Sequence, residues 1–491
     1  MNEQPTFVIL SFEGPDRYTH AGGLGTRVTE LATTLSTMGF ETHPFFLGDP
    51  NLPGRETPEG GQLVLHRWCQ WISRYHPNGV YDGEEGKLSD WERSLPPWLE
   101  KELLEPRMAA GGSVVVMAEE WHTVSSVLAL REILARRGWQ DRVHLLWNAN
   151  NTFSFHRIDW DALKQAATIT TVSRYMKHVM WQVGVDPWVV PNGIPEGWLQ
   201  PPDQADQLNL SLLLRDRLAL VKVARWDPDK RWEMAVDAVA EMKRLGLRPL
   251  LLARGGVEAH QTKVLARAEE KGLKVALAHW DGAKVGPFAE ALRLVLDADL
   301  VNLRGYLSPA QRRALFHVAD AVLANSGVEP FGLVGLETMA VGGVAFVGCT
   351  GEDYVTPGHD AISLQSNDPN EIVHHIIQLY QCREAGFRMR QAARLSAERY
   401  TWPAVIHRAL LPVLEQLGAY FGDRESIPVD RAVTALGNST SATPLGAKGR
   451  VQADVIAPVT TLRQRNNLYT KREPEYVETT KQADDSYGSI A

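Results

Sequence analysis

Cysteine is scarce in this chain of 491 residues, which holds Cys69, Cys349 and Cys382 and no others. So few cysteines at this spacing exclude a disulfide framework and a CxxC metal site, and they fit a reducing cytoplasm. The start of the chain, MNEQPTFVILSFEGPD, has no basic residue before a short apolar run, so we expect no signal peptide. The sequence has no run of about 18 apolar residues, so we expect no membrane span.

Positive charge is also in short supply. The chain has 51 Lys and Arg residues and 59 Asp and Glu residues, which gives a net charge of −8. This balance argues against a general nucleic-acid binder, although it leaves room for a local basic cleft. Apolar residues make up 44% and charged residues 22%, as in an ordinary soluble globular protein. A chain of this length predicts more than one domain.

The stretch around which the chain is organised is Asn325–Gly343, which reads NSGVEPFGLVGLETMAVGG. An apolar strand at residues 320–324 leads into it. We expect a helix from Pro330 to about Ala340, because proline suits the first helical position. The free N–H groups of a helix start form an anion site, and Gly332 lets a ligand approach closely.

Two carboxylates, Glu329 and Glu337, flank this expected anion site. Eight residues of helix would rise about 12 Å, roughly the reach from a hexose, across a diphosphate, to a ribose. Glu329 could then hold sugar hydroxyls and Glu337 could hold ribose hydroxyls. The simpler interpretation is an amphipathic helix that carries two solvated glutamates.

Two expected strands in the first half of the chain are also followed by loops whose residues could bind a ligand or take part in catalysis. Thr6–Ser11 is followed by HAGGLG, in which Gly22 and Gly23 form a turn before a helix. Val114–Ala118 is followed by His122, which would lie at the ligand edge of a parallel sheet. The alternatives are a tight turn for the glycines and a structural role for the histidine.

In the second half, the expected strand Leu218–Ala224 is followed by Arg225 and Lys230. They are five residues apart across a strand-to-helix turn, so both can point at one diphosphate and stabilise a leaving group there. Otherwise they are two surface cations. The strings Asp227-x-Asp229 and Asp297-x-Asp299 look like metal-binding motifs, but we interpret both as structural, because Arg225 and Lys230 would do the work of a metal.

Residues 52–112 are less regular, with PEGG, HPNGVYDGEEG and LPPW, and we interpret them as loops and short helices inserted in the first domain. The tryptophans of this segment are Trp68, Trp71, Trp91 and Trp98. Exposed aromatic rings could stack on sugars, whereas buried ones would pack the insertion.

Several of these motifs resemble those of retaining glycosyltransferases with the GT-B fold, the group that includes glycogen, starch and sucrose synthases. Glu329 and Glu337 resemble its Glu-x7-Glu segment, GGLG its Lys-x-Gly-Gly-Leu loop, and EEWHT its Asp-Trp-His-Thr segment. VPNGI at residues 190–194 resembles the link between its domains. His20 stands where the family has Lys, and Glu352 replaces the second glycine of its Thr-Gly-Gly loop.

The resemblance implies a role for each matched residue. It implies catalytic roles for His122, Arg225, Lys230 and Glu329. It implies donor-binding roles for Gly22, Gly23, Gly332, Leu333, Glu337, Thr350 and Gly351. Asn148, Asn150 and Asn151 lie where the family often has His-Asn, so a role for them is conceivable. The resemblance implies no metal and no other cofactor.

The alternation of buried strands and helices predicts an α/β protein, and the resemblance implies two Rossmann-like doubly wound domains that face each other. We expect an acceptor-side domain at 1–198, a nucleotide-sugar-binding domain at 199–400 and a helix at 401–423 that crosses back to the first domain. From residue 424 to 491 apolar periodicity is lost, which predicts a disordered tail.

The resemblance implies a cytoplasmic enzyme that moves a hexose, with glucose favoured, from a sugar nucleotide to a hydroxyl of a glucan or a small molecule. The leaving phosphate is thought to help deprotonate the acceptor on the same face, so no nucleophile is assigned. The expected partners are the sugar nucleotide and the acceptor, with no nucleic acid. Two alternatives stay open: a sugar-nucleotide epimerase on the same fold, and a sugar-nucleotide sensor without activity. The sequence does not distinguish ADP, UDP and GDP as the donor nucleotide.

Overall fold

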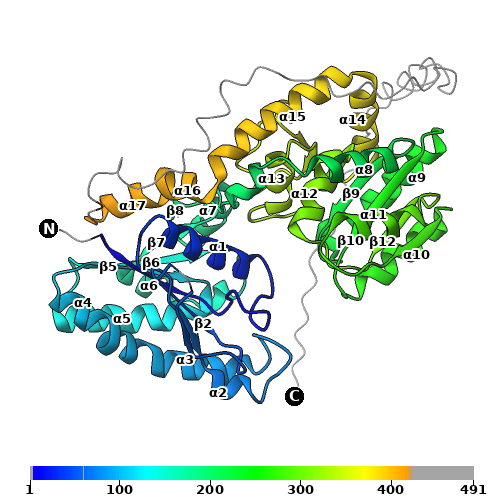
Figure 1. Cartoon of the computed structure of the whole chain (residues 1–491). Coiled ribbons are helices and arrows are strands. Elements are labelled where there is room, and N and C mark those ends of the chain that lie inside the picture. Colours follow the sequence, from blue (N-terminus) through cyan, green and yellow to red (C-terminus); the bar gives the residue numbers. More distant parts are fainter. Residues whose placement is uncertain (1–3, 59, 420, 422–491) are drawn as a thin grey trace, which may run out of the picture. The chain divides into compact units, whose positions relative to one another are not determined.

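The computed structural model describes residues 4–58, 60–419 and 421. Its strands form two sheets (Figure 1). The first sheet has the order β3-β4-β2-β1-β5-β6-β7-β8, and its pairs are parallel except for β3 with β4. Its strands are β1 (Thr6–Leu10), β2 (Thr42–Leu47), β3 (Arg55–Glu56), β4 (Leu65–Trp68), β5 (Val114–Glu119), β6 (Val143–Ala149), β7 (Thr168–Thr171) and β8 (Trp188–Val189).

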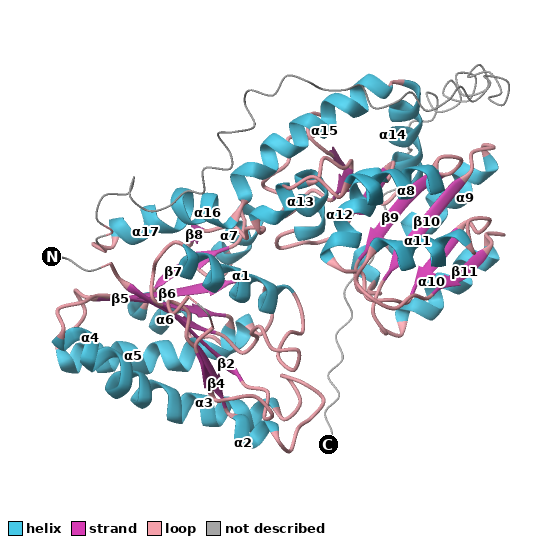
Figure 2. Cartoon of the chain, viewed as in Figure 1, coloured by secondary structure: helices cyan, strands magenta, loops and turns pink. Residues whose placement is uncertain are grey.

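Helices cover both faces of the first sheet, so its central strands are buried throughout, as parallel strands are. Figure 2 shows α1 over one face and α3 with α5 over the other. These helices are α1 (Gly23–Thr37), α2 (Gln70–Ser73), α3 (Glu84–Trp98), α4 (Glu105–Ala109), α5 (Val124–Arg137), α6 (Trp160–Ala166) and α7 (Arg174–Trp181).

The second sheet is parallel throughout, in the order β11-β12-β10-β9-β13-β14-β15. Its strands are β9 (Leu218–Val223), β10 (Pro249–Arg254), β11 (Val275–Ala278), β12 (Leu300–Leu303), β13 (Ala321–Ala324), β14 (Ala345–Val347) and β15 (Ile362–Ser363). Its helices are α8 (Gln204–Leu214), α9 (Trp232–Arg244), α10 (His260–Glu270), α11 (Val285–Arg293), α12 (Pro309–Val318), α13 (Leu333–Ala340), α14 (Pro369–Gln381) and α15 (Arg383–Ala397). Alternate residues of β9 face different cores, Leu220 one and Val221 the other, which is the signature of a sheet between two helical layers.

The expected crossing helix is present as α16 (Trp402–Val405) and α17 (Leu411–Gln416), joined by a wider turn. Its apolar residues, among them Trp402 and Ile406, share one core with Phe7 of β1 and Val28 of α1. The Trp402 indole donates to Glu30 Oε2 at 2.9 Å. The helix that follows the second sheet therefore packs on the first, as predicted.

The segment 52–112 differs from our expectation of loops and short helices. It contributes β3 and β4 to the edge of the first sheet, and a helical run from Glu84 to Ala109. The prolines Pro96 and Pro97 lie inside that run, where they masked its helical period in the sequence. In the described part of the chain no helix is long and apolar enough to cross a membrane. The predicted tail, 424–491, lies outside the described residues.

Candidate active site

The order of the strands reverses at two points, between β1 and β5 in the first sheet and between β9 and β13 in the second. Ligands of open parallel sheets bind beyond the carboxyl ends of the strands at such reversals. Arg225 and Lys230 follow β9, Glu329 follows β13 and His122 follows β5. Most residues that the sequence singled out therefore lie at one reversal or the other.

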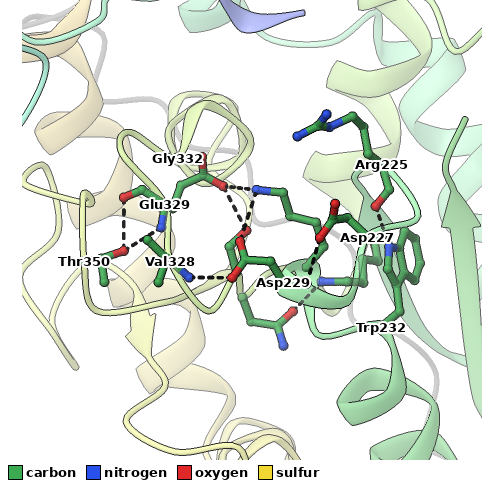
Figure 3. Close-up of polar contacts among 12 residues, drawn as sticks. Arg225, Asp227, Asp229, Trp232, Val328, Glu329, Gly332 and Thr350 are labelled. Atoms are coloured by element: carbon green, nitrogen blue, oxygen red, sulfur yellow. Dashed lines mark hydrogen bonds and ion pairs between the residues drawn. The ribbon is translucent and has the colours of Figure 1, made fainter. Parts of the chain in front are cut away.

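Lys230 and Glu329 form an ion pair at the second reversal. Lys230 Nζ lies 2.7 Å from Glu329 Oε2, and the hydroxyl of Ser326 donates to the same oxygen at 2.9 Å. The Glu329 N–H donates to Thr350 Oγ1 at 2.9 Å. Figure 3 shows Glu329 between Thr350 and the turn that carries Asp229. The position of this carboxylate is therefore fixed from both sides.

Arg225 is exposed, and within the described residues its guanidinium has no hydrogen bond or ion pair. Its backbone is fixed, because its carbonyl accepts from the Trp232 indole at 2.8 Å (Figure 3). A free guanidinium and a lysine in the same turn give this loop positive charge that an anionic ligand could use.

The carboxylates of the first Asp-x-Asp string hold the backbone. Asp227 Oδ1 accepts from the Asp229 N–H at 2.9 Å, and Asp229 Oδ1 accepts from the Val328 N–H at 3.0 Å (Figure 3). Asp229 thereby ties the β9 turn to the loop that carries Glu329. In the second string Asp299 accepts from Lys243 at 2.6 Å. Among the described residues, no group of three His, Cys, Asp or Glu side chains could hold a metal ion.

Helix α13 begins at Leu333 and not at Pro330, so this expectation was wrong. Gly332 precedes it, and the segment from Pro330 is loop. The predicted rise of about 12 Å between the two glutamates therefore does not apply, since only the residues from 333 onward are helical. Glu337 is buried and accepts from Arg312 Nη1 at 2.9 and 3.1 Å. Burial raises the pKa of Glu337, against the opposing effect of Arg312.

The Thr350-Gly351-Glu352 loop lies against the start of α13. Gly351 is required by close approach, because a Cβ there would lie 2.1 Å from the carbonyl oxygen of Pro330. Glu352 Oε2 accepts from the Thr350 N–H at 2.9 Å, and its Oε1 is buried. A Cβ on Gly332 would lie 3.3 Å from that Oε1. Burial, and secondarily the charge of Glu329, raise the pKa of Glu352 to about 7.

The glycine loop of the first sheet is filled by a residue that the sequence analysis missed, Glu13. Its Oε2 accepts from the N–H groups of Gly22 and Gly25, each at 2.9 Å, and of Ala21 at 3.2 Å. Its Oε1 accepts from the Tyr81 hydroxyl at 2.6 Å. These N–H groups are the ones a phosphate would use, so the role implied for Gly22 and Gly23 requires Glu13 to move.

His122 lies directly after β5, stacked between Phe12 at 4.1 Å and Trp121 at 4.0 Å between ring centres. Its Nε2 lies 2.7 Å from Oε1 of Glu84, the first residue of α3. Burial lowers the pKa of His122 and so favours the neutral ring. If Nε2 donates to Glu84, then Nδ1 is an acceptor. It is buried with no partner in the described residues.

A buried polar network lies beneath His122. Arg27 Nε donates to Glu119 Oε1 at 3.1 Å, and both side chains are buried. Asn148 and Asn150 donate to Glu119 Oε2 at 2.8 and 2.7 Å. Two of the three asparagines noted in the sequence thus bind a carboxylate. The neighbouring Glu120 adopts φ of +68°, and burial raises its pKa to about 8.

Lys222 is a further residue that the analysis missed. It lies on β9, buried, and its Nζ donates to Asn325 Oδ1 at 2.6 Å and to the Leu323 carbonyl at 3.1 Å. Burial, and then the charges of Lys230 and Arg231, lower its pKa to about 7. The one signal in the sequence was a lysine inside an apolar strand, LALVKV.

Residues 289–396 match the family described as "Glycosyl transferases group 1". A search of curated proteins found no match. Among solved structures, sucrose-phosphate synthase from Thermosynechococcus elongatus aligns over 85% of this chain and 100% of its own, with a TM-score of 0.59 and 17% identity.

Two further structures are similar. The catalytic domain of starch synthase IV from Arabidopsis thaliana, bound to ADP and acarbose, aligns over 83% of this chain and 100% of its own, with a TM-score of 0.57 and 14% identity. Anabaena HepE in complex with UDP-glucose aligns over 84% of this chain and 99% of its own, with a TM-score of 0.55 and 13% identity. At such identities the likeness shows the fold. The protein has the GT-B fold predicted from the sequence, and its residues 289–396 match the group 1 glycosyltransferase family.

Proposed function

We propose that the protein is a retaining hexosyltransferase that moves a hexose, with glucose favoured, from a nucleoside-diphosphate sugar to an acceptor hydroxyl. The observation that carries the proposal is the arrangement at the second reversal, where Lys230 pairs with Glu329 at 2.7 Å and Arg225 in the same turn has no partner among the described residues. The group 1 match over residues 289–396 supports it. Two similar structures hold a sugar nucleotide, UDP-glucose, and a nucleoside diphosphate, ADP, which agrees with a donor of this class.

The chemistry requires charge to develop at two places. As the bond between C1 and the leaving oxygen breaks, the sugar gains positive charge and the diphosphate gains negative charge. Arg225 and Lys230 would stabilise the diphosphate, and Glu329, released from Lys230, would accept hydrogen bonds from sugar hydroxyls. His122 would position the sugar from the first sheet. The leaving phosphate would take the acceptor proton on the same face, which gives retention.

We propose that no divalent metal takes part. Asp227 and Asp229 use carboxylate oxygens to hold backbone N–H groups, and Lys230 Nζ lies 4.0 Å from Asp229 Oδ2. A cation between these aspartates would be repelled by that lysine. Arg225 and Lys230 supply the positive charge that a metal would otherwise bring.

Arg225→Ala and Lys230→Ala should each lower turnover at least a hundredfold at saturating donor, with the fold unchanged. Removing one group that stabilises transition-state charge typically costs about 3–4 kcal/mol. The control is Lys263→Ala on α10, which breaks a more exposed ion pair with Glu233 at 2.9 Å. Near-normal turnover in either site variant would contradict the assignment.

The donor and the reaction class can be tested together by incubating ADP-, UDP- and GDP-glucose with glucans and small acceptors in excess EDTA, following diphosphate release. Acceptor-dependent release supports the transferase. Solvent isotope exchange at C2 without an acceptor would indicate the epimerase, and tight binding without turnover would indicate the sensor. Activity lost in EDTA and restored by Mg²⁺ or Mn²⁺ would overturn the metal-free site.

A further inference from the structure

Among the aromatic side chains of the segment 52–112, Trp71 and Tyr75 are the most exposed, Tyr81 is less so, and the remaining tryptophans are packed. Trp91 is fully buried, and Trp68 and Trp98 pack edge to face, 5.5 Å apart. In contrast, Trp71 is 61% exposed and Tyr75 is 78% exposed. They lie four residues apart, Trp71 on α2 and Tyr75 just after it. Both residues line the same cavity, so together they form one exposed aromatic surface.

These two rings border a cavity of about 430 Å³ between α2 and α3, within the size range of small-ligand sites. Its lining consists of Trp71, Ile72, Tyr75, His76, Gly86, Ser89, Asp90 and Arg93. The Trp71 indole donates to Asp90 Oδ2 at 3.2 Å, which holds the ring in place. Arg93 Nε donates to the Ser89 carbonyl at 3.0 Å, and its terminal nitrogens have no partner within the described residues.

The lining excludes several ligand classes. One carboxylate and one guanidinium balance each other, so the cavity favours an uncharged ligand over a nucleotide or a phosphate. The surface that a ligand meets is mostly apolar, because Trp71, Ile72 and Tyr75 contribute to it, so the ligand must offer apolar faces as well as hydroxyls. Aromatic faces carry negative electrostatic potential and attract the C–H groups of a sugar ring, while Asp90 and Arg93 can bind its hydroxyls. We propose that Trp71, Tyr75, Asp90 and Arg93 form a binding site for a neutral oligosaccharide chain.

The same segment borders a second, larger cavity of about 900 Å³. Arg74 and Pro77–Asp82 line it on one side, and His20 and Ala21 of the glycine loop line it on another. Tyr81 joins this cavity to Glu13 through its hydroxyl, and its ring centre lies 5.9 Å from that of His122. A sugar chain bound on Trp71 and Tyr75 can therefore extend past the backbone of this segment into the larger cavity, and from there toward the candidate active site. This extension, unlike the binding itself, rests on the proposed function.

The test measures binding without donor, so it is independent of transferase activity. Maltoheptaose, isomaltohexaose, cellohexaose and laminarihexaose are titrated by calorimetry into the full chain. We expect at least one to bind. Trp71→Ala and Tyr75→Ala should each weaken that binding at least tenfold, while Trp71→Phe retains most of it. Donor-dependent diphosphate release with a small acceptor should be unchanged in all three variants.

The chain offers a matched control in Trp181, which is 54% exposed and donates to Asp186 Oδ1 at 2.7 Å but borders neither cavity. Trp181→Ala should leave oligosaccharide binding unchanged. Absence of binding to all four oligosaccharides, or equal binding in the Trp71 and Tyr75 variants, would overturn the proposal. So would a change in sedimentation of Trp71→Ala without any sugar binding, which would show that the rings contact a second copy of the chain.

Discussion

Two glutamates, Glu13 and Glu352, lie at backbone sites that an anion could otherwise occupy. Glu13 accepts from three N–H groups of the glycine loop, and Glu352 accepts from Thr350 beside the start of α13. The spacing of the motifs predicted these two loops. It could not show that Glu13 and Glu352 bind their backbone N–H groups. Glu13 lies twelve residues before Gly25 and reaches it because the chain turns back after β1. This contact depends on the tertiary fold, so a local sequence pattern does not reveal it.

Glu352 should make donor binding depend on pH. Burial raises the pKa of Glu352 to about 7, so its carboxyl is mostly neutral at pH 6 and mostly ionised at pH 8. An ionised Glu352 would repel a diphosphate at the start of α13. The donor KM should therefore rise between pH 6 and pH 8, and this rise should flatten in Glu352→Gln.

Two other charged groups of the second sheet define the control for that experiment. Glu329 faces it as a like charge, and Lys222, whose pKa burial lowers to about 7, loses its own charge in the same range. The wild-type profile alone therefore does not identify the titrating group. Lys222→Met should leave the dependence on Glu352 in place. A profile of equal steepness in Glu352→Gln and the wild type would contradict the prediction.

Glu120 should make the folded protein less stable as pH rises. Burial raises its pKa from an ordinary value of 4.5 to about 8, so between these values the folded state holds a proton that the unfolded state has lost. The contribution of this group to the free energy of unfolding is greatest below pH 4.5. It falls between pH 4.5 and pH 8, by at most about 1.4 kcal/mol per pH unit. Urea midpoints from pH 5 to pH 8 should decline less in Glu120→Gln. An unchanged decline would show that Glu120 is ionised in the fold.

At the scale of helices and strands, regular elements were predictable and their ends were not. Helix α12 (Pro309–Val318) is an exception, because its start is marked in the sequence: Ser308 caps it and Pro309 takes the first helical position. The start of α13 was misplaced at Pro330, because a proline also suits the loop that brings Glu329 to Thr350. The strand Val275–Ala278 was missed because its apolar run is only four residues long, and it is an edge strand whose residues are mostly not buried.

The crossing helix should be essential to the stability of the first sheet. Trp402 is buried at 1% exposure, and a Cβ on Gly193 would lie 2.6 Å from its ring. Trp402→Ala should lower the free energy of unfolding by about 3–5 kcal/mol, because it leaves a large cavity. Urea unfolding followed by circular dichroism measures this loss. The control is Trp188→Ala on β8, 45% exposed, which should change it by less than about 0.5 kcal/mol.

For the molecule as a whole, the sequence predicted two doubly wound sheets because parallel strands are buried on both faces and read as apolar runs. β1, β5 and β9 are such runs. The candidate site was found through residues beyond the ends of these strands. Its ion pair between Lys230 and Glu329 joins positions 99 residues apart, so only the fold brings them together.

The predicted tail, 424–491, should contribute little to the stability or the activity of the protein. A chain ending at Asp423 keeps Phe421, which is buried in the core of the first sheet, and loses a segment without apolar periodicity. Its melting temperature should stay within about 2 °C of the full chain, and its diphosphate release should be unchanged. A larger drop on truncation, measured by calorimetry, would show that the tail packs against the fold.

The carboxylate of Glu13 has a consequence for product inhibition. The N–H groups of Ala21, Gly22 and Gly25 are already bonded to Glu13, so a departing nucleoside diphosphate could use these three donors only if Glu13 moved. Retention of the spent nucleotide then depends on the second sheet, where Arg225 and Lys230 lie. In the proposed transferase, the rate of product release would then depend mainly on those two side chains for as long as Glu13 occupies the glycine loop.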